Sequence, residues 1–371
     1  MTAPLRALVD QVEEIAPLRL QEPDDNSGLA AGDPEGEVRA VALALDATRD
    51  AVRFAAERGA GLLLVHHPLI YRPILTLRED RYPGDVLAAA VRASVAIYCA
   101  HTSFDSAPGG MSDYVAARLG LTNVTPLSPA ARDPYVKVVT FVPESHAAPV
   151  AEAIFAAGGG VIGNYGHCSF RNPGTGSFLP LEGSSPYSGT KGRVSYEPES
   201  RLEVRVPRER LDEVLSALRA AHPYDEAAFD VYPILGGERW GLGRVGDLPE
   251  ATDLGSLARR CKEALALDAA RVVGDPASPV TRVAVCTGAG GSVLARAAAA
   301  GARALVTGDV SYHLARDAQR LGVALIDAGH FGTERIFVDA MGARLAERLA
   351  AAGLAVEVLP FRGERDPFQT A

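Results

Sequence analysis

The stretch GLLLVHHP, at residues 61–68, decides the fold, because an apolar run ends there in two adjacent histidines and a proline. Such a run is typical of a strand buried on both faces of a parallel sheet. Neighbouring side chains on a regular strand point to opposite faces, so His66 and His67 reach one site only where the strand has ended. Open α/β sheets form sites beyond the carboxyl ends of their strands, and a site is therefore predicted at that edge. The alternative is that both histidines are capping or core residues.

Strand-like and helix-like segments alternate on both sides of this stretch. The apolar runs VALAL (41–45) and VAIYCA (95–100) predict two further strands. Helical patterns lie between and after the strands, at 47–58, 84–93 and 110–119. Apolar strands separated by helices favour parallel pairing with both faces covered, and we predict an α/β lobe over residues 1–130.

The same alternation returns after Trp240. Buried strands are predicted at RVAVCTG, ARALVTGD, VALIDAG and VEVLPF, with helices between them. In both regions a buried strand ends in a polar cluster, a helix follows, and the next strand ends in another cluster. The pattern predicts a second lobe, residues 237–371, that is similar to the first.

Residues 131–236 have a different pattern, which predicts a domain inserted between the lobes. The order is strand, helix, strands, helix and strand, from VKVVTFV to FDVYPI, and this is the order of a ferredoxin-like α+β unit. The segment NPGTGSFLPLEGSSPYSGTKG in its middle is rich in glycine, serine and proline and predicts turns and loops. His222, in the motif HPYDE, is interpreted as part of a structural turn or a subunit contact.

The composition excludes several classes of protein. The chain has 371 residues, of which 47% are hydrophobic and 22% charged, as is typical of a compact protein with more than one domain. Its 37 basic and 46 acidic residues give a formal charge of -9, which repels phosphate backbones, so no nucleic acid partner is expected. The amino-terminal segment lacks the apolar core of a signal peptide, and no segment is apolar for long enough to span a membrane. We expect a cytoplasmic location and no membrane partner.

Polar clusters follow three more predicted strands. Each cluster contains a histidine and a carboxylate in a short motif: His101 and Asp105 in HTSFD, His330 and Glu334 in GHFGTE, and Asp309 and His313 in GDVSYH. Taken alone, each motif has an ordinary interpretation as a turn, a helix cap or a first helical turn. Five of the eight histidines nevertheless lie in strand-end clusters, which makes a shared site the better hypothesis.

The donor types in these clusters indicate a metal site without thiolates. The four cysteines are scattered singly with no CxxC spacing, so neither a disulfide framework nor a cysteine zinc site is expected. Imidazoles mixed with carboxylates suit zinc first, and also manganese, iron or cobalt, and carboxylates can bridge two ions. We therefore expect two divalent metal ions as cofactors.

The motifs HHP, HTSFD and GHFGTE, in this order and separated by an insert, carry a family resemblance. The chain resembles the NGG-one-interacting-factor-three-like family, many of whose members carry the label GTP cyclohydrolase type two homologue. The resemblance covers essentially the whole chain. It implies two similar α/β lobes that form one metal-binding unit, an inserted domain similar to PII-like signalling folds, and a toroidal homohexamer with metal sites facing an interior cavity.

The resemblance also implies roles for individual residues. It implies that His66 and His67 bind different ions. It also implies that Asp105 and Glu334 contribute carboxylates at the metal pair and that His330 supplies the last imidazole. Two more histidines fall at motif positions that line the site in such proteins, next to the ligands or in contact with substrate: His101 and His313.

Function follows from the number of ligands and their charge. Five protein ligands shared between two ions leave coordination positions open for water, which is typical of a catalytic metal site. We predict a dinuclear metal-dependent hydrolase acting on a small anionic, nucleotide-like substrate, because two divalent ions and only two carboxylates would form a cationic centre. The alternative is a non-catalytic metal-binding assembly or a regulatory protein whose insert senses a ligand. The glycine-rich TGAGG at 287–291 predicts either a tight turn or a cradle for phosphate.

Overall fold

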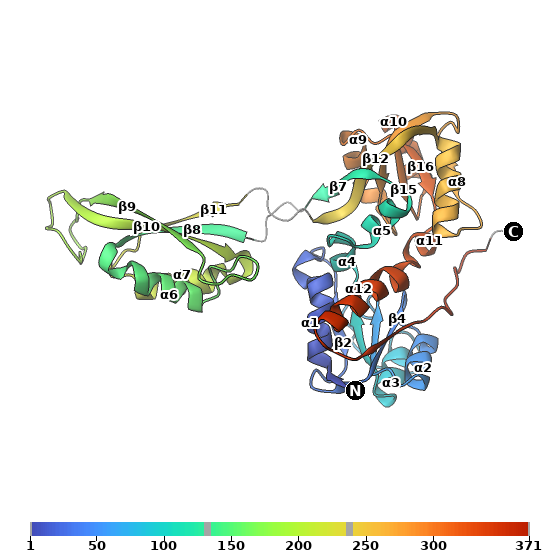
Figure 1. Ribbon diagram of the computed structural model, residues 1–371, viewed down its shortest axis with the longest axis horizontal. Helices are drawn as coiled ribbons and strands as arrows, with labels where there is room; N and C mark the ends of the chain where they lie inside the picture. Colours follow the sequence, from blue (N-terminus) through green and yellow to red (C-terminus); the bar gives the residue numbers. More distant parts are fainter. Residues whose placement is uncertain (1, 130–134, 235–239, 370–371) are drawn as a thin grey trace. The chain divides into compact units, whose positions relative to one another are not determined.

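The computed structural model describes residues 2–129, 135–234 and 240–369, and the chain divides into two compact units. One unit, which we call the main unit, combines Met1–Ala130 with Arg239–Ala371. The other, the inserted unit, is Ala131–Glu238. Strands and helices are mixed in both units (Figure 1), so the predicted mixed α/β character of the chain is confirmed.

A five-stranded sheet in the main unit contains GLLLV. The strand order is β17-β4-β5-β6-β2, and all neighbours are parallel except β2, an antiparallel edge strand. The strands are β2 (Gly28–Ala31), β4 (Ala40–Ala44), β5 (Leu62–Val65), β6 (Ala96–Cys99) and β17 (Glu357–Pro360). The associated helices are α1 (Leu5–Ile15), α2 (Arg49–Glu57), α3 (Gly84–Arg92) and α12 (Phe337–Ala351). Helices α4 (Thr102–Ser106) and α5 (Met111–Arg118) follow β6 in the chain but contact the other large sheet of the unit, and β1 (Ala3–Pro4) pairs with β3 (Glu37–Val38).

The side chains of β5 alternate between two layers of helices. Leu62 and Leu64 pack in a core with α1 and α12, whereas Leu63 and Val65 pack in a second core with α2 and α3. Both faces of the strand are therefore buried. This explains why the strand consists of consecutive apolar residues rather than an alternating pattern.

A six-stranded sheet completes the main unit. Its order is β13-β16-β15-β14-β12-β7, with β14, β15 and β16 parallel and the other three antiparallel to their neighbours. The strands are β7 (Thr122–Pro129), β12 (Gly241–Asp253), β13 (Arg271–Val273), β14 (Pro279–Val285), β15 (Ala304–Thr307) and β16 (Ala324–Asp327). The helices are α8 (Leu254–Leu265), α9 (Leu294–Ala299), α10 (Tyr312–Leu321) and α11 (His330–Glu334). Val285 and Val306 pack in the same core as Leu62 and Leu64, so one hydrophobic core joins the two sheets.

Two strands pair outside the region to which the sequence pattern assigns them. β7 lies before residue 130, in the predicted first lobe, but pairs with β12 in the six-stranded sheet. β17 lies in the predicted second lobe, but pairs in parallel with β4 of the five-stranded sheet. The boundaries at 130 and 237 therefore do not separate the two sheets, because each region contributes an edge strand to the other's sheet.

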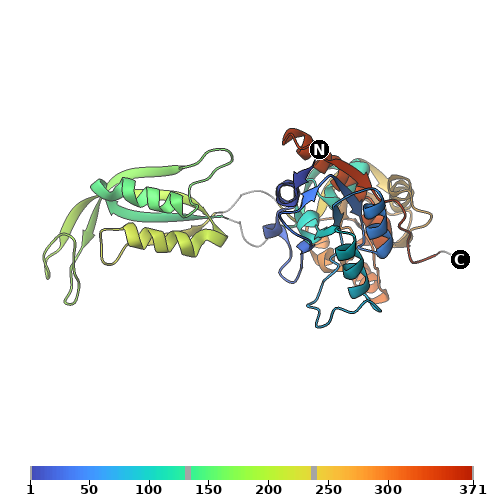
Figure 2. The ribbon, with the colours of Figure 1, turned by 90° about the horizontal axis from the view of Figure 1, so that it is seen from below.

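The inserted unit has the element order strand, helix, strand, strand, helix, strand. These elements are β8 (Tyr135–Pro143), α6 (Ala147–Ala156), β9 (Ser169–Phe178), β10 (Ser195–Pro207), α7 (Leu211–Ala221) and β11 (Phe229–Pro233). The strands form one antiparallel sheet in the order β11-β8-β10-β9. Val138, Leu202 and Val204 pack against Ile154 of α6 and Leu218 of α7. Both helices cover the same face of the sheet, as Figure 2 shows.

None of the helices in the described parts of the chain combines the length and the apolar character that a membrane span requires.

Candidate metal centre

The backbone leaves β5 in a way that brings two consecutive histidines to one place. The amides of His66 and His67 both donate to the carbonyl of Leu45, with N···O distances of 3.2 and 3.0 Å, so the regular ladder between β5 and β4 has ended. The two imidazole centroids lie 5.1 Å apart. Sequence neighbours that would face opposite ways on a strand are thus side by side.

Helix α11 supplies another histidine and a carboxylate. His330 and Glu334 are one helical turn apart, and His330 Nε2 lies 2.9 Å from Glu334 Oε2. The loop after β14 passes close to this carboxylate at Gly288, which has a positive φ of 62°. A Cβ at Gly288 would lie 2.2 Å from Glu334 Oε1, so a residue with a side chain would displace the carboxylate.

Glu334 lies at the centre of the cluster. Its Oε2 lies 2.9 Å from Nε2 of both His67 and His330, whose Nε2 atoms are 3.4 Å apart. Its Oε1 lies 3.6 Å from Nε2 of His66, which is also 3.8 Å from Asp105 Oδ1. The two oxygens of one carboxylate therefore face two different groups of donors.

Four histidines of the cluster share one hydrogen-bonding arrangement. The Nδ1 atoms contact oxygens at 2.7 to 2.9 Å, namely Ala100 O for His66, Asp46 Oδ1 for His67, Asp25 Oδ1 for His101 and Asp309 Oδ2 for His330. A carbonyl and an ionised carboxylate can only accept, so each Nδ1 carries a proton and donates it. In the neutral imidazole, Nε2 is then left with a free lone pair, as in metal-binding histidines.

The Nε2 atoms converge closely enough to share metal ions. Two groups have donor atoms that all lie within 4.8 Å of one another: His66, His67 and His101, and His67, His330 and Glu334. His67 belongs to both groups. The arrangement offers two adjacent positions for a cation, both surrounded by nitrogen and oxygen.

His66 Nε2 provides an independent indication that a cation fits. This side chain is fully buried, and its Nε2 has no hydrogen-bond partner among the residues that the structure describes. Leaving a buried polar atom without a partner costs free energy, and such atoms are rare in folded proteins. A metal ion bound at this lone pair would remove the cost, so the residues present fit a divalent cation.

Without a cation, protons accumulate on the cluster. Burial lowers the pKa of His67, but hydrogen bonds with Asp46 and Glu334 outweigh it and raise the pKa to about 10. A hydrogen bond with Glu334 raises the pKa of His330 to about 9, against burial. Burial raises the pKa of Asp105 as well. Burial also opposes ionisation of Glu334, but His66 and the hydrogen bond with His330 hold its pKa well below its usual range.

The structure brings together the five side chains predicted as ligands, which are His66, His67, Asp105, His330 and Glu334. His101 lies with them, and its Nε2 is a potential donor atom like the others. His313 does not join this cluster among the described residues: it is exposed on α10, with its ring against Tyr312. Asp309, from the same motif, contacts His330 Nδ1.

Sequence reasoning missed two carboxylates of the centre. Asp46 directly follows VALAL, so the strand-end rule could have found it. Asp25 lies in a loop before the antiparallel strand β2, where that rule does not apply. Its carboxylate accepts hydrogen bonds from His101 Nδ1, from the Thr102 amide at 3.1 Å and from the Thr102 hydroxyl, so it fixes the start of α4.

The glycine-rich TGAGG segment forms a turn in which the amides of Gly288 and Gly290 already have partners. Gly288 N donates to Thr333 Oγ1 at 2.9 Å, and Gly290 N donates to Thr307 Oγ1 at 2.8 Å. These contacts hold the loop against α11 and β15. Of the two interpretations of this segment, the tight turn is the one that the hydrogen bonds favour.

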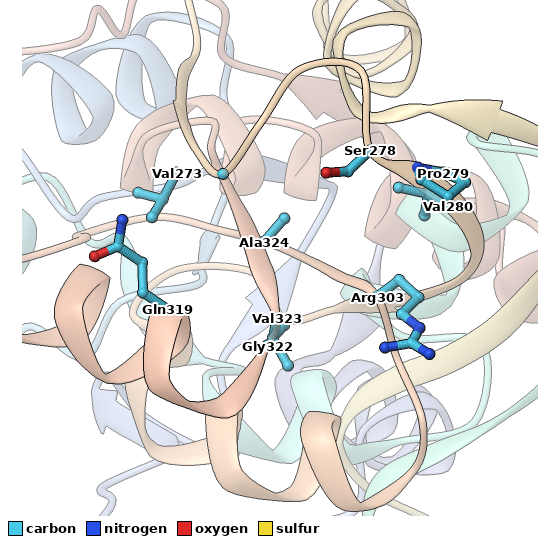
Figure 3. A pocket seen from close by; sticks show the side chains of 10 residues that line it. Val273, Ser278, Pro279, Val280, Arg303, Gln319, Gly322, Val323 and Ala324 are labelled. Atoms are coloured by element: carbon cyan, nitrogen blue, oxygen red, sulfur yellow. The ribbon is translucent and has the colours of Figure 1, made fainter.

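A pocket of about 480 Å³ at the six-stranded sheet is separate from this centre. Figure 3 shows Ser278, Arg303 and Gln319 around it, together with Pro279 and Ala324. The last two residues begin β14 and β16. The pocket therefore lies at the amino ends of parallel strands whose carboxyl ends lead to the histidines and carboxylates.

A comparison with known families identifies the chain as a whole. The sequence profile described as Duf34/NIF3 (NGG1p interacting factor 3) matches residues 3–367. The chain belongs to the DUF34/NIF3 family. The resemblance carried by HHP, HTSFD and GHFGTE is thereby confirmed.

Relatives in the DUF34/NIF3 family match over most of their length. A protein of Halalkalibacterium halodurans named GTP cyclohydrolase 1 type 2 homolog is 36% identical over 364 residues, 98% of each chain. The protein of the same name from Mycobacterium tuberculosis is 42% identical over 343 residues, 90% of this chain and 89% of the relative.

Solved structures also match over the full chain. The crystal structure of a Bacillus cereus protein related to NIF3 has a TM-score of 0.77 and 36% identity, covering 100% of this chain and 99% of that one. A Staphylococcus aureus structure has a TM-score of 0.84 and 25% identity, with the same coverage.

Proposed function

We propose that this DUF34/NIF3 protein is a metal-dependent hydrolase with a dinuclear centre. The observation that carries the proposal is the shared arrangement of the four histidines. Their Nδ1 atoms contact oxygens outside the cluster, while the other ring nitrogens converge: those of His66, His67 and His330 around Glu334, and that of His101 with those of His66 and His67. Preorganised imidazole donors of this kind are typical of metal sites. Zinc is the first candidate ion, followed by manganese, iron and cobalt.

Glu334 divides the donors into two sets. His67, His330 and Glu334 Oε2 would hold one ion. His66, Asp105 and Glu334 Oε1 would hold the other. His101 would complete the second set, since its donor atom lies with those of His66 and His67.

Burial defines the side from which a substrate approaches. The side chains of His66 and Glu334 are 0% and 4% exposed, so they form the floor of the centre. Those of His67, His101 and His330 are 25%, 23% and 36% exposed and form its open side. When bound, two divalent ions would polarise a substrate oxygen and lower the pKa of water. A substrate would then reach the ions past the rings of His67, His101 and His330.

We propose a small anionic substrate, phosphorylated or nucleotide-like. The name GTP cyclohydrolase 1 type 2 homolog of the relatives supports a nucleotide-like molecule. The charge of the centre is closer to neutral than the sequence argument assumes, because Asp25, Asp46 and Asp309 lie behind the histidines. Preference for an anion would therefore arise from direct contact of its oxygens with the ions rather than from net charge.

The test is a screen of nucleotides and phosphoesters with metal-reconstituted protein. The control is the double variant His66→Ala, Asp105→Ala, which removes two donors of the same set. We expect release of product from at least one compound by the unaltered protein and none by the double variant. Equal rates in both proteins, or no turnover of any compound by protein that retains its metal, would contradict the proposal.

We also propose an assembly and a cellular location for the protein. The toroidal homohexamer is proposed from the family resemblance, and light scattering that gives the mass of a monomer or dimer would contradict it. A cytoplasmic location is likewise proposed and can be tested by fractionating cells that express the natural protein.

A further inference from the structure

The inserted unit contains a cavity of its own. Its volume is about 740 Å³, within the range of small-molecule sites. Its walls are the end of β9, the loop that follows it, the middle of β10, and the HPYDE turn after α7. Asp225 Oδ2 accepts a hydrogen bond of 2.8 Å from the amide of Ser185, so the loop and the turn are tied together across the cavity.

A buried carboxylate without a cationic partner lies in this cavity. Glu199, on β10, is only 8% exposed. It accepts a hydrogen bond of 2.7 Å from the hydroxyl of Tyr224, and in the described part of the chain no lysine, arginine or histidine forms an ion pair with it. A Cβ at Gly176 would lie 2.1 Å from Glu199 Oε2, so the glycine leaves space for the carboxylate. Burying an unpaired carboxylate is costly, and a bound cation would compensate for it.

Aromatic rings line the same cavity as this carboxylate. The ring centroid of Tyr224 lies 6.0 Å from those of both Phe178 and Tyr187. The faces of aromatic rings attract organic cations. Rings that stand beside a buried carboxylate therefore favour a ligand with a positive charge and an apolar body.

His222 positions one of these rings and adds no positive charge. Its Nε2 lies 3.0 Å from the carbonyl of Phe141, which can only accept, and its Nδ1 accepts a hydrogen bond from the Tyr224 amide at 3.1 Å. The ring is therefore a neutral imidazole, and burial lowers its pKa. His222 thus holds the HPYDE turn in place and keeps Tyr224 beside Glu199.

The other charged residues that line the cavity are also negative. Asp225 and Glu226 also line the cavity, and the described lining residues include no lysine, arginine or histidine. We propose that the cavity binds a small organic cation, an amine or quaternary ammonium group attached to an apolar body about the size of one ring. Three carboxylates would repel a phosphate, so this ligand differs from the anionic substrate proposed for the metal centre.

Three compounds with the same ring and different charges test the proposal on the full chain. We expect benzyltrimethylammonium to bind at least about tenfold more tightly than benzyl alcohol in titration calorimetry, and benzoate not to bind. Removing metal with a chelator should leave these affinities unchanged. Equal affinity for the cation and the alcohol, or tighter binding of benzoate, would overturn the proposal.

Variants locate the binding within the inserted unit. Glu199→Gln keeps the size of the side chain and an acceptor for Tyr224, and we expect about a tenfold loss of affinity for the cation with no change for the alcohol. Glu213→Gln removes the same charge from the exposed surface of α7 and is the matched control, with unchanged binding expected. Tyr187→Leu, at a half-exposed position, is the second variant and should weaken binding of the cation even if Glu199→Gln fails to fold. Unchanged binding of the cation in folded variants at both positions would also overturn the proposal.

Discussion

Glu334 Oε2 lies 2.9 Å from His67 Nε2, although 267 residues separate the two side chains in the sequence. His67 follows a strand of the five-stranded sheet, and Glu334 belongs to a short helix that follows a strand of the six-stranded sheet. The candidate metal centre therefore takes its residues from both sheets, and a hydrophobic core that the two sheets share holds those residues in place. Binding of a metal ion to this centre would stabilise the folded main unit.

Glu334→Gln should remove the carboxylate that faces both groups of donors. The change keeps the size of the side chain but loses its charge, so we expect metal retention and hydrolytic rate to fall together. The loss of metal affinity should exceed the roughly 10- to 100-fold loss that is typical when the mutated residue contacts a metal-binding side chain but not the ion itself. Glu347→Gln, on the exposed side of α12, is the control. Metal content after dialysis is the measurement, and a variant that retained its ions as the control does would refute the central role of Glu334.

Asp46→Ala should weaken metal binding without touching a donor atom. The carboxylate of Asp46 holds His67 Nδ1 at 2.8 Å and is half-exposed, so the fold should tolerate its loss. We expect a loss of metal affinity of about 10- to 100-fold. Asp50→Ala, an exposed position on α2, should have no effect. Competition with a chromogenic chelator measures the metal affinity of both variants. Equal affinities in Asp46→Ala and Asp50→Ala would show that the contact of Asp46 with His67 Nδ1 does not contribute to metal binding.

Metal binding should release protons and strengthen as the pH rises. The pKa values of about 10 for His67 and about 9 for His330 mean that both imidazoles are protonated at pH 7 in the metal-free protein. A metal ion must displace these protons, so its affinity should increase as the pH rises towards 9 to 10 and fall in acid. Calorimetry in buffers with different ionisation enthalpies counts the protons. An affinity independent of pH between 6 and 9 would contradict this expectation.

The same pKa values predict the opposite trend for the stability of the metal-free protein. Both values are raised above the ordinary 6.5 of histidine. Their contribution to stability is therefore fully present below pH 6.5 and is lost as the pH rises through about 9 to 10. Urea denaturation of the metal-free protein at pH 6.5 and pH 10 measures this difference. Greater stability at pH 10 would show that the two imidazoles do not gain their partners on folding.

Gly288→Ala should disturb the metal centre through a single methyl group. The new Cβ would lie 2.2 Å from Glu334 Oε1, so the carboxylate must move. Gly353→Ala is a matched control, because its φ of 69° imposes similar strain, of about 1–2 kcal/mol, while no atom of the described residues lies within 4 Å of the added Cβ. Both variants should lose stability in thermal unfolding, but only Gly288→Ala should lose metal. Equal metal content in the two variants would contradict the close approach.

The sequence predicted the strands of the main unit where burial determines the pattern, but it did not predict which strands pair when the partners are remote in the chain. β4, β5 and β6 are apolar on both faces, so each could be recognised alone. The pairing of β17 with β4 joins segments more than 300 residues apart, and nothing local in VEVLPF specifies that partner.

The residues of the candidate site were predictable where they come directly after the end of a strand. His66 and His67 could be found because the polar residues come directly after an apolar run. Asp25 could not, since it comes from a loop whose position depends on the edge strand β2. The charge of the centre differs from the one expected from the sequence, because the carboxylates of Asp25, Asp46 and Asp309 behind the histidines were not counted there.

The most direct test of the dinuclear centre is the number of metal ions bound per chain. Protein reconstituted with zinc, manganese, iron or cobalt and freed of excess ions should contain two ions per chain by elemental analysis. His330→Ala removes a donor of one set only and should reduce the content towards one. Two ions in the unaltered protein and one in the variant are the predicted result. A content of one or none in the unaltered protein under all of these conditions would contradict the account.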